Sequence, residues 1–435
     1  MTENLIETKL PTKNTKRTHW SWFPSLLFGD GLNMSVIVMS LIMMRRFGLN
    51  NAQITFYAAI IGIPFILRPL LEMAVTFFRG TTKVWILSAE FISALSLWAT
   101  AFTLPTNYWL QGTMCFLPFF VFSAIFNNIA LERFYLDLPS KGTPHQEVLS
   151  ILFRCMAILF GIGTVSMLAG NMEVVTRNIR YSWSFVFYIM AGIEFFLWLW
   201  HSIFLPGGLR QCITDKDLFG LNTKDYNIVV NMVTNGFKNR FMLYFIMLSM
   251  LPEALMSPIL LLFMIDAPHN GGLGLSPQEF GLSVGTIGIT TLFVGLRFGA
   301  YIIKRFGLHK CTLPMAMSMA VLGASMLYLS YNPASSLATI CLSVLTGFLM
   351  FGFGLSAYTA NVEFFANKAP GAVFRKAIAL SLMSLVMVMV SVFSGLIQTN
   401  VGYRQFFTIS LAMNAVPIIM AIVYTIMRRK ENTLL

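Results

Sequence analysis

Eight ionisable side chains lie inside long apolar stretches of the 435-residue sequence. Each stretch holds about 20 residues, which is the length of helix that crosses the hydrocarbon core of a bilayer. A charge at the bilayer centre costs about 2.5–3.5 kcal/mol on insertion scales, so such a group is expected to face a cavity or an ionic partner. The eight residues are Asp30, Arg68, Glu72, Glu90, Arg154, Glu194, Glu253 and Arg297.

Two of these carboxylates are candidates to carry a proton. Glu253 lies about halfway along its apolar stretch and directly follows Pro252. Proline removes a helix donor, and broken helices near the midplane are where transporters bind substrates and ions. Asp30 lies between two glycines, which allow close approach of the backbone. The alternatives are a structural ion pair for Glu253 and a structural hydrogen bond for Asp30.

Three arginines are candidates to attract or gate an anionic solute. We expect Arg68 and Arg154 to contact an anionic group of the substrate. Arg68 and Glu72 are four residues apart, so an ion pair within one helix is the alternative for Arg68. Arg297 lies between two glycines in a spacing that suits helix packing, and it is expected near the cytoplasmic end, where it acts in gating or only snorkels.

Two groups of polar residues end further apolar stretches. We expect both groups at the cytoplasmic mouth of a cavity. The two asparagines of the first group and Tyr358 are predicted to contact substrate, and Glu132 and Glu363 to act in gating. The groups are Asn127, Asn128 and Glu132, and Tyr358, Asn361 and Glu363. For Glu90 and Glu194 the sequence indicates no partner.

The sequence lacks the motifs that are typical of nucleotide binding, metal binding and hydrolysis. The sequence has no Walker-type phosphate loop, no GxGxxG before a helix, no HExxH motif, and no Ser/His/Asp set on a soluble module. The five cysteines show no metal-binding spacing, and the five histidines form no cluster. We therefore predict no catalytic residue, no metal site, no cofactor and no enzyme.

Composition predicts a membrane protein. The chain is 56% hydrophobic and only 11% charged, so its main solvent is expected to be the lipid bilayer. The net charge of +12 could suggest a nucleic-acid partner, but the basic residues sit at the ends of apolar stretches and form no run. This is the pattern of topology signals, so we expect no nucleic-acid partner.

The chain divides into about twelve apolar spans, all expected to be helices. We predict a basic tail over 1–19, an N-terminal six-helix bundle over 20–205, a linker over 206–240, a C-terminal six-helix bundle over 241–427 and a tail over 428–435. If the N-terminus lies inside, 22 of the 30 lysines and arginines fall on the inside and 5 on the outside. The positive-inside rule then predicts that both termini and the linker are cytoplasmic. Arg45 and Arg46 form the one pair that argues against this.

A repeated pattern indicates two similar halves. Asn50 precedes the second span, with Gln53 three residues later, and Ser276 precedes the eighth, with Glu279 three residues later. Both are capping-box arrangements, in which each side chain pairs with a backbone N–H of the first helical turn. Pro277 also occupies the first helical position, where its missing N–H costs nothing. The same box at the second span of each half indicates parallel halves of six spans.

Several short stretches form a family pattern. They are Leu262–Pro268, Gly271–Ser276, Gly285–Thr286, Ile303–Leu308, Pro252–Leu255, Pro64–Leu70 and Ile129–Tyr135. The chain resembles the AmpG-like muropeptide permeases of the major facilitator superfamily, over most of its length and most clearly at Asp266–Leu308. The resemblance implies an all-helical fold of about twelve membrane helices in two pseudo-symmetric six-helix bundles, in a bacterial inner membrane. It also implies proton-driven import of a small solute, an anhydro-muropeptide in the named members.

Two positions depart from that family. The family usually has an Asp at the end of the second span, where this chain has Thr76, and often two Asp at the end of the fourth, where it has Asn128 and Glu132. The family also resembles acetyl-CoA transporters. Because a candidate proton site is missing at 128, coupling and substrate identity both stay open, and muropeptide specificity is not predicted.

The residues and the resemblance together predict a secondary active transporter that works by alternating access. Glu253 or Asp30 would carry the proton, and a monomer would take a small anionic solute as its partner. A membrane sensor or scaffold that binds a solute without moving it is the alternative. A membrane acyltransferase would need a His or Cys at the cavity, and the sequence indicates none.

Overall fold

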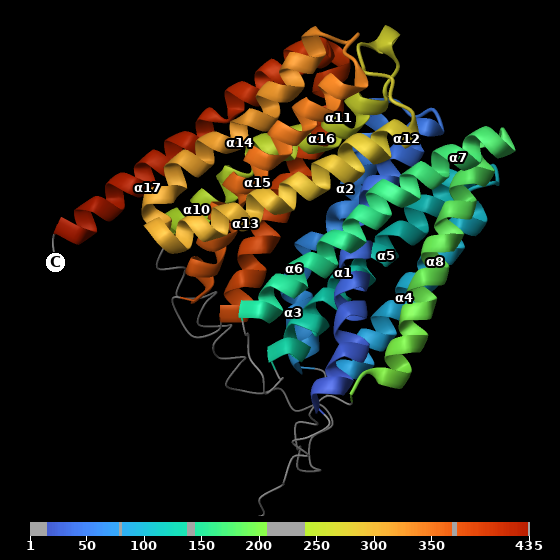
Figure 1. The fold of residues 1–435 in the computed structure, drawn as a ribbon, viewed down its shortest axis with the longest axis horizontal. Coiled ribbons are helices and arrows are strands. Elements are labelled where there is room, and N and C mark those ends of the chain that lie inside the picture. Colours follow the sequence, from blue (N-terminus) through green and yellow to red (C-terminus); the bar gives the residue numbers. More distant parts are fainter. Residues whose placement is uncertain (1–14, 78–80, 137–143, 207–239, 368–371, 434–435) are drawn as a thin grey trace, which may run out of the picture.

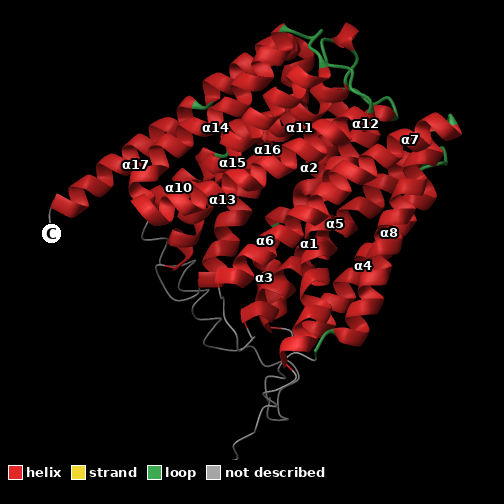
Figure 2. Cartoon of the chain, viewed as in Figure 1, coloured by secondary structure: helices red, strands yellow, loops and turns green. Residues whose placement is uncertain are grey.

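The computed structural model describes residues 15–77, 81–136, 144–206, 240–367 and 372–433. The predicted tail over 1–19 and linker over 206–240 lie almost wholly outside these residues. The described residues form helices joined by short loops and contain no strand (Figure 2). Helices of the first half of the chain lie beside one another, and those of the second half lie against them (Figure 1).

The N-terminal half begins with α1 (Thr15–Arg46) and contains six apolar spans. A break at Leu67, flanked by two prolines in sequence, divides its second span into α2 and α3. The fifth span contains a π-helical turn, η1, between α6 and α7. The remaining bounds are α2 (Asn51–Ile66), α3 (Arg68–Phe77), α4 (Thr82–Thr103), α5 (Trp109–Leu136), α6 (Pro144–Ile158), η1 (Leu159–Val165), α7 (Ser166–Thr176) and α8 (Ile179–Phe204).

The C-terminal half also contains a broken span and a π-helical segment, but in its first and second spans. Its first span breaks at Met250, just before Pro252, as the sequence predicted. Its second span also contains a π-helical segment, η3. The bounds are α10 (Arg240–Ser249), α11 (Leu251–Ile265), η2 (Pro268–Asn270), α12 (Pro277–Phe280), η3 (Gly281–Gly288), α13 (Ile289–Phe306), α14 (Leu308–Tyr331), α15 (Leu337–Asn367), α16 (Ala372–Met413) and α17 (Ala415–Thr433).

Eleven helices among the described residues are long and apolar enough to cross a membrane. The last candidate, Val373–Met427, has 55 residues, so as one straight helix it would reach about 80 Å, far beyond a bilayer. Its backbone leaves the helical region at Gly402 (φ 77°), a conformation that glycine adopts without steric cost. This break separates the predicted eleventh and twelfth spans.

Both predicted capping boxes are confirmed. The Asn50 side chain accepts from the Gln53 backbone while the Gln53 side chain accepts from Asn50, and Ser276 and Glu279 do the same before α12. Each box begins the second span of its half. The repeated sequence pattern therefore marks a repeated structural element.

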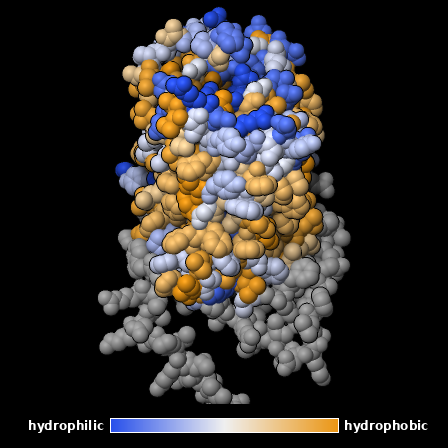
Figure 3. All heavy atoms as spheres, turned by 90° about the vertical axis from the view of Figure 1, so that its right-hand side faces the viewer, coloured by the Kyte–Doolittle hydropathy of each residue, from blue (hydrophilic) through white to orange (hydrophobic). Residues whose placement is uncertain are grey.

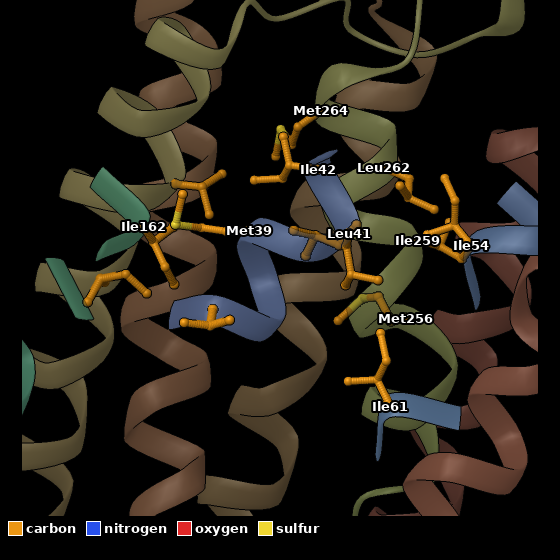
Figure 4. Packing of buried hydrophobic residues seen from close by; sticks show 14 of the residues in the cluster. Met39, Leu41, Ile42, Ile54, Ile61, Ile162, Met256, Ile259, Leu262 and Met264 are labelled. Carbon is orange, nitrogen blue, oxygen red and sulfur yellow. The ribbon is translucent and has the colours of Figure 1, made fainter. Parts of the chain in front are cut away.

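The two halves share one apolar core. In Figure 4, residues of α1 such as Leu41 and Ile42 lie among residues of α2, η1 and α11. Leu41 and Ile42 are buried, as are Ile259 and Leu262 on α11. Because α11 belongs to the C-terminal half, this packing holds the two halves together near Arg46, where α1 ends. Figure 3 shows a mainly apolar flank below a polar end, as expected for a lipid-facing surface.

Candidate functional site

Asp30 and Arg154 are brought together in the N-terminal half. Asp30 Oδ2 on α1 lies 2.8 Å from Arg154 Nε on α6. Asp30 Oδ1 accepts a 2.8 Å hydrogen bond from Asn128 Nδ2 on α5. The Asp30 carboxylate is buried, whereas the Arg154 side chain is 34% exposed. Gly31 permits this closeness, because a Cβ there would lie 2.7 Å from the Arg154 carbonyl oxygen.

The contacts continue from Asn128 to the other half of the molecule. Arg68 Nη2 on α3 donates to Asn128 Oδ1 at 3.0 Å and to Glu132 Oε2 at 3.2 Å. Lys376 Nζ, near the start of α16, donates to Glu132 Oε1 at 3.3 Å. We call these six residues the Asp30 network: Asp30, Arg154, Asn128, Arg68, Glu132 and Lys376. Glu132 is therefore where this network joins the two halves.

The alternative ion pair within the second span is wrong. Arg68 does not pair with Glu72, although the two are four residues apart. Glu72 accepts instead from Arg133 Nη2 on α5 at 3.0 Å, and Arg68 turns to Glu132. The break at Leu67 places Arg68 at the very first position of α3, and α5 supplies a partner of opposite charge to each residue. Both ion pairs join α3 to α5.

Glu253 lies inside the C-terminal half. It is half-buried and lines a small pocket. Among the described residues it makes no hydrogen bond or ion pair. The residues that line this pocket all belong to the C-terminal half, so this pocket does not include Asp30. Its other lining residues are Ser249, Pro252, Met256, Met319, Phe351 and Asn414.

Four other predicted residues lie apart from the Asp30 network. Asn127 and Tyr358 are buried, and the Asn127 side-chain oxygen and the Tyr358 hydroxyl have no hydrogen-bond partner within the described parts of the chain. Arg297 and Glu363 are exposed and make no ion pair with any described residue. The glycines on either side of Arg297 do pack closely on α15, since a Cβ on Gly295 would lie 2.1 Å from the Leu349 oxygen.

A second network joins the halves near the Gly402 break of α16. Asp266 follows α11 and forms an ion pair with Arg45, at the end of α1. Tyr403 Oη on α16 donates to Asp266 Oδ2 at 2.8 Å, and Asn51 Nδ2 on α2 donates to Tyr403 Oη at 2.8 Å and to Gln398 Oε1 at 2.7 Å. We call these five residues the Asp266 network. Lys376 and Tyr403 are about 40 Å apart along α16, so the two networks lie at opposite ends of the molecule.

Asp266 is held in its charged form. Burial raises its pKa, but hydrogen bonds from Tyr403 and Asn270 and the charge of Arg45 together lower the pKa below its usual value. Asn270 donates to Asp266 Oδ1 at 3.2 Å, and so does the backbone N–H of Ala267 at 2.9 Å. A carboxylate with this many donors is expected to stay ionised near neutral pH.

Arg45 and Arg46, the pair that argued against the predicted orientation, both form ion pairs near the Asp266 network. Arg45 is paired with Asp266, and Arg46 is paired with Glu173 on α7. Glu173 also accepts from Trp183 Nε1 on α8 at 2.8 Å. Both arginines are thus neutralised locally, which weakens them as topology signals.

Sequence reasoning missed the Asp266 network entirely. Asp266 lies in the stretch that carries the clearest family resemblance, but an Asp after an apolar span reads as an ordinary loop residue. Lys376 likewise read as a topology signal at a span end. Their partners are 221 and 244 residues away along the chain, and no spacing rule reaches that far.

The fold has many solved counterparts. The structure superposes on the D-xylose-proton symporter with a TM-score of 0.68 and 15% identity, covering 94% of this chain and 97% of that one. It matches a bacterial homologue of the human lysosomal transporter Spinster with a TM-score of 0.67 and 13% identity over 97% and 98% of the two chains. For the nucleoside transporter NupG the TM-score is 0.64, with 15% identity over 95% and 98%.

The chain has the major facilitator fold. The fold class predicted from the sequence is therefore confirmed, and the protein is a multi-pass membrane protein. No family model matches the sequence, and no curated protein matches it. At these identities the likeness establishes the fold alone, so the AmpG-like assignment stays a prediction. Within this fold, the Asp30 network joins the two halves at one end of the molecule, and the Asp266 network joins them at the other end.

Proposed function

We propose that the chain is a secondary active transporter that imports a small anionic solute together with a proton. The observation that carries the proposal is the pair of networks that join the two halves, one near the start of α16 and one near its Gly402 break. Alternating access requires one end to open while the other stays closed. Each network consists of polar contacts that can break and re-form at its own end.

Proton and anion binding are linked through Asp30 and Arg154. While Asp30 is ionised, it holds the guanidinium of Arg154 at 2.8 Å. A proton on Asp30 neutralises the carboxylate and frees Arg154, whose side chain is one-third exposed, to bind an anion. Each ligand thereby favours the other, which is the coupling that symport requires. Arg68, shared between Asn128 and Glu132, is the second arginine placed to attract the solute.

Glu253 is the alternative proton carrier. It lines the small pocket and lacks a cationic partner among the described residues, so it would act separately from the Asp30 network. Glu253→Gln in proteoliposomes tests this role, because undiminished proton-driven uptake would remove Glu253 from coupling.

The finer assignment follows the sequence resemblance. We propose an AmpG-like transporter of a bacterial inner membrane, a monomer with both termini in the cytoplasm. This orientation puts the Asp266 network on the outside and Lys376 on the inside. The solved neighbours include a nucleoside transporter, a D-xylose-proton symporter and a transporter in complex with a thioalcohol-conjugated peptide, which supports a small-solute cargo.

Counterflow tests the proposal directly. Proteoliposomes loaded with unlabelled anhydro-muropeptide should take up the labelled compound faster than empty ones, because exchange needs only alternation of the site. A solute-binding sensor or scaffold would bind the label without trapping it inside. Saturable binding with no counterflow would therefore favour the sensor over the transporter.

A further inference from the structure

A buried polar cluster of the N-terminal half has no role in the function proposed above. Glu90 on α4 and Glu194 and His201 on α8 are each at most 3% exposed. His201 Nδ1 lies 2.7 Å from Glu90 Oε1, and His201 Nε2 lies 2.8 Å from Ser25 Oγ on α1. We propose that Ser25, His201, Glu90 and Glu194 form a proton-binding site that exchanges its proton with Asp30.

The hydrogen positions around Ser25 give two states that differ by one proton. Ser25 Oγ is 2.9 Å from the Trp22 carbonyl oxygen as well as 2.8 Å from His201 Nε2. If the hydroxyl donates to Trp22, then Nε2 must carry a hydrogen and donate to Ser25. The 2.7 Å contact between Nδ1 and Glu90 then also needs a proton, since otherwise two acceptors would face each other.

In the second state the hydroxyl of Ser25 turns to His201. It donates to Nε2, and Nδ1–H donates to the Glu90 carboxylate. This state holds one proton fewer, yet every heavy atom keeps its place. The cluster can therefore gain or lose a proton by rotating one hydroxyl, without repacking its helices.

Glu194 connects the cluster to the Asp30 network. It lies seven residues before His201 on α8, so the two share a helix face. Glu194 Oε1 and Glu90 Oε2 are buried oxygens without a hydrogen-bond partner among the described residues. A Cβ on Gly29, next to Asp30, would lie 3.3 Å from the side chain of Leu197, three residues after Glu194, so α1 and α8 pack closely at this level. Because an unpaired buried charge is costly, Glu194 is suited to hold a proton as the neutral acid.

The other ionisable groups on the surrounding helices interact with groups outside this cluster. Lys83, at the start of α4, donates to the carbonyl oxygens of Ser202 and Leu205 at the end of α8. Arg154 on α6 is paired with Asp30. Tyr135 on α5 interacts electrostatically with both members of that pair.

Nitrogen-15 NMR of histidine-labelled full-length protein in lipid bilayers tests proton binding. As the pH is lowered, His201 should change from the Nδ1–H tautomer to a form that carries a hydrogen on Nε2. Glu90→Gln, which removes the charge and keeps the shape, should move the midpoint by at least about one pH unit, a tenfold change in proton affinity. Ser25→Ala should also move it, and provides a second variant if Glu90→Gln does not fold. Glu279→Gln, a surface carboxylate that Gln can replace in a capping box, should leave it unchanged.

A His201 Nε2 that carries a hydrogen at every pH, or at none, would overturn the proposal. So would a midpoint that neither Glu90→Gln nor Ser25→Ala alters. Exchange with Asp30 rests on the proposed function and has its own test. Glu194→Gln should slow uptake of labelled anhydro-muropeptide driven by a proton gradient at least threefold and leave counterflow at the wild-type rate. Wild-type rates in both assays would refute the exchange step, whereas absent counterflow in the wild-type protein would refute the transporter itself.

Discussion

At the scale of single residues, Asp30 and Asp266 differ in their partners. Asp30 forms an ion pair with Arg154 and accepts a hydrogen bond from Asn128. Asp266 accepts from Arg45, Tyr403, Asn270 and the Ala267 backbone, which lower its pKa. A carboxylate whose folded-state pKa is lowered stabilises the fold above its ordinary pKa of about 4, and the stabilisation is lost only as pH falls through the lowered value.

Asp266→Asn should therefore destabilise the protein by a constant amount near neutrality. Hydrogen bonds to a charged group contribute about 1.5–3 kcal/mol, so the melting temperature should fall. The difference between wild type and variant should be the same from about pH 5 to pH 8, because Asp266 is ionised throughout. Thermal unfolding in detergent at a series of pH values measures this. A difference that shrinks steadily across that range would show that Asp266 titrates there.

The sequence predicted which polar residues in the apolar stretches are candidates for function. It did not predict which residues they contact. Asp30, Arg68, Arg154, Asn128 and Glu132 were all singled out as ionisable or polar groups in apolar sequence, and the structure joins them. The Arg68–Glu72 alternative failed because helix spacing describes one helix and takes no account of α5. Glu90 and Glu194 were noticed without a partner, since His201 at a span end gave no signal of its contact with α4.

At the scale of elements, the crossing of η1 and η3 is a close contact between the two halves. A Cβ on Gly285 would lie 2.5 Å from Gly163 Cα, so the two backbones touch where both spans are π-helical. Single π-turns inside helices occur often at functional sites. η1 belongs to the fifth span of the N-terminal half and η3 to the second span of the C-terminal half, so this crossing joins the two halves directly.

Gly285→Ala should loosen this crossing. The added methyl has no room against η1, and overpacking typically costs about 1–3 kcal/mol. Gly192→Ala on α8 is the matched control, because a Cβ there meets no atom within 4 Å. The control should stabilise the helix by about 0.5–1 kcal/mol. Melting temperatures that move in the same direction for both variants would contradict the tight crossing.

The elements themselves were largely predictable. The lengths of the apolar stretches predicted the spans, and Pro252 predicted the break before α11. The repeated capping boxes predicted that the second spans of the two halves are equivalent. The π-helical segments were not predictable, because they arise where two backbones must approach and no local propensity encodes that. The turn at Gly402 was expected only as a short loop between two spans.

At the scale of the whole molecule, orientation depends on the distribution of Lys and Arg. The one contrary pair, Arg45 and Arg46, is neutralised by Asp266 and Glu173. A fluorescent protein fused after Leu435 should therefore fluoresce in the cytoplasm, and alkaline phosphatase at the same place should be inactive. Active phosphatase at this position would reverse the proposed orientation and exchange the outer and inner networks.

The central claim is that a proton on Asp30 drives solute movement by releasing Arg154. The most direct measurement is accumulation of labelled anhydro-muropeptide in proteoliposomes under an imposed proton gradient, compared with counterflow in the same vesicles. Asp30→Asn, a permanently neutral isostere, should lose gradient-driven accumulation and keep counterflow, while Glu279→Gln should keep both. Accumulation by Asp30→Asn at the wild-type level would contradict the claim.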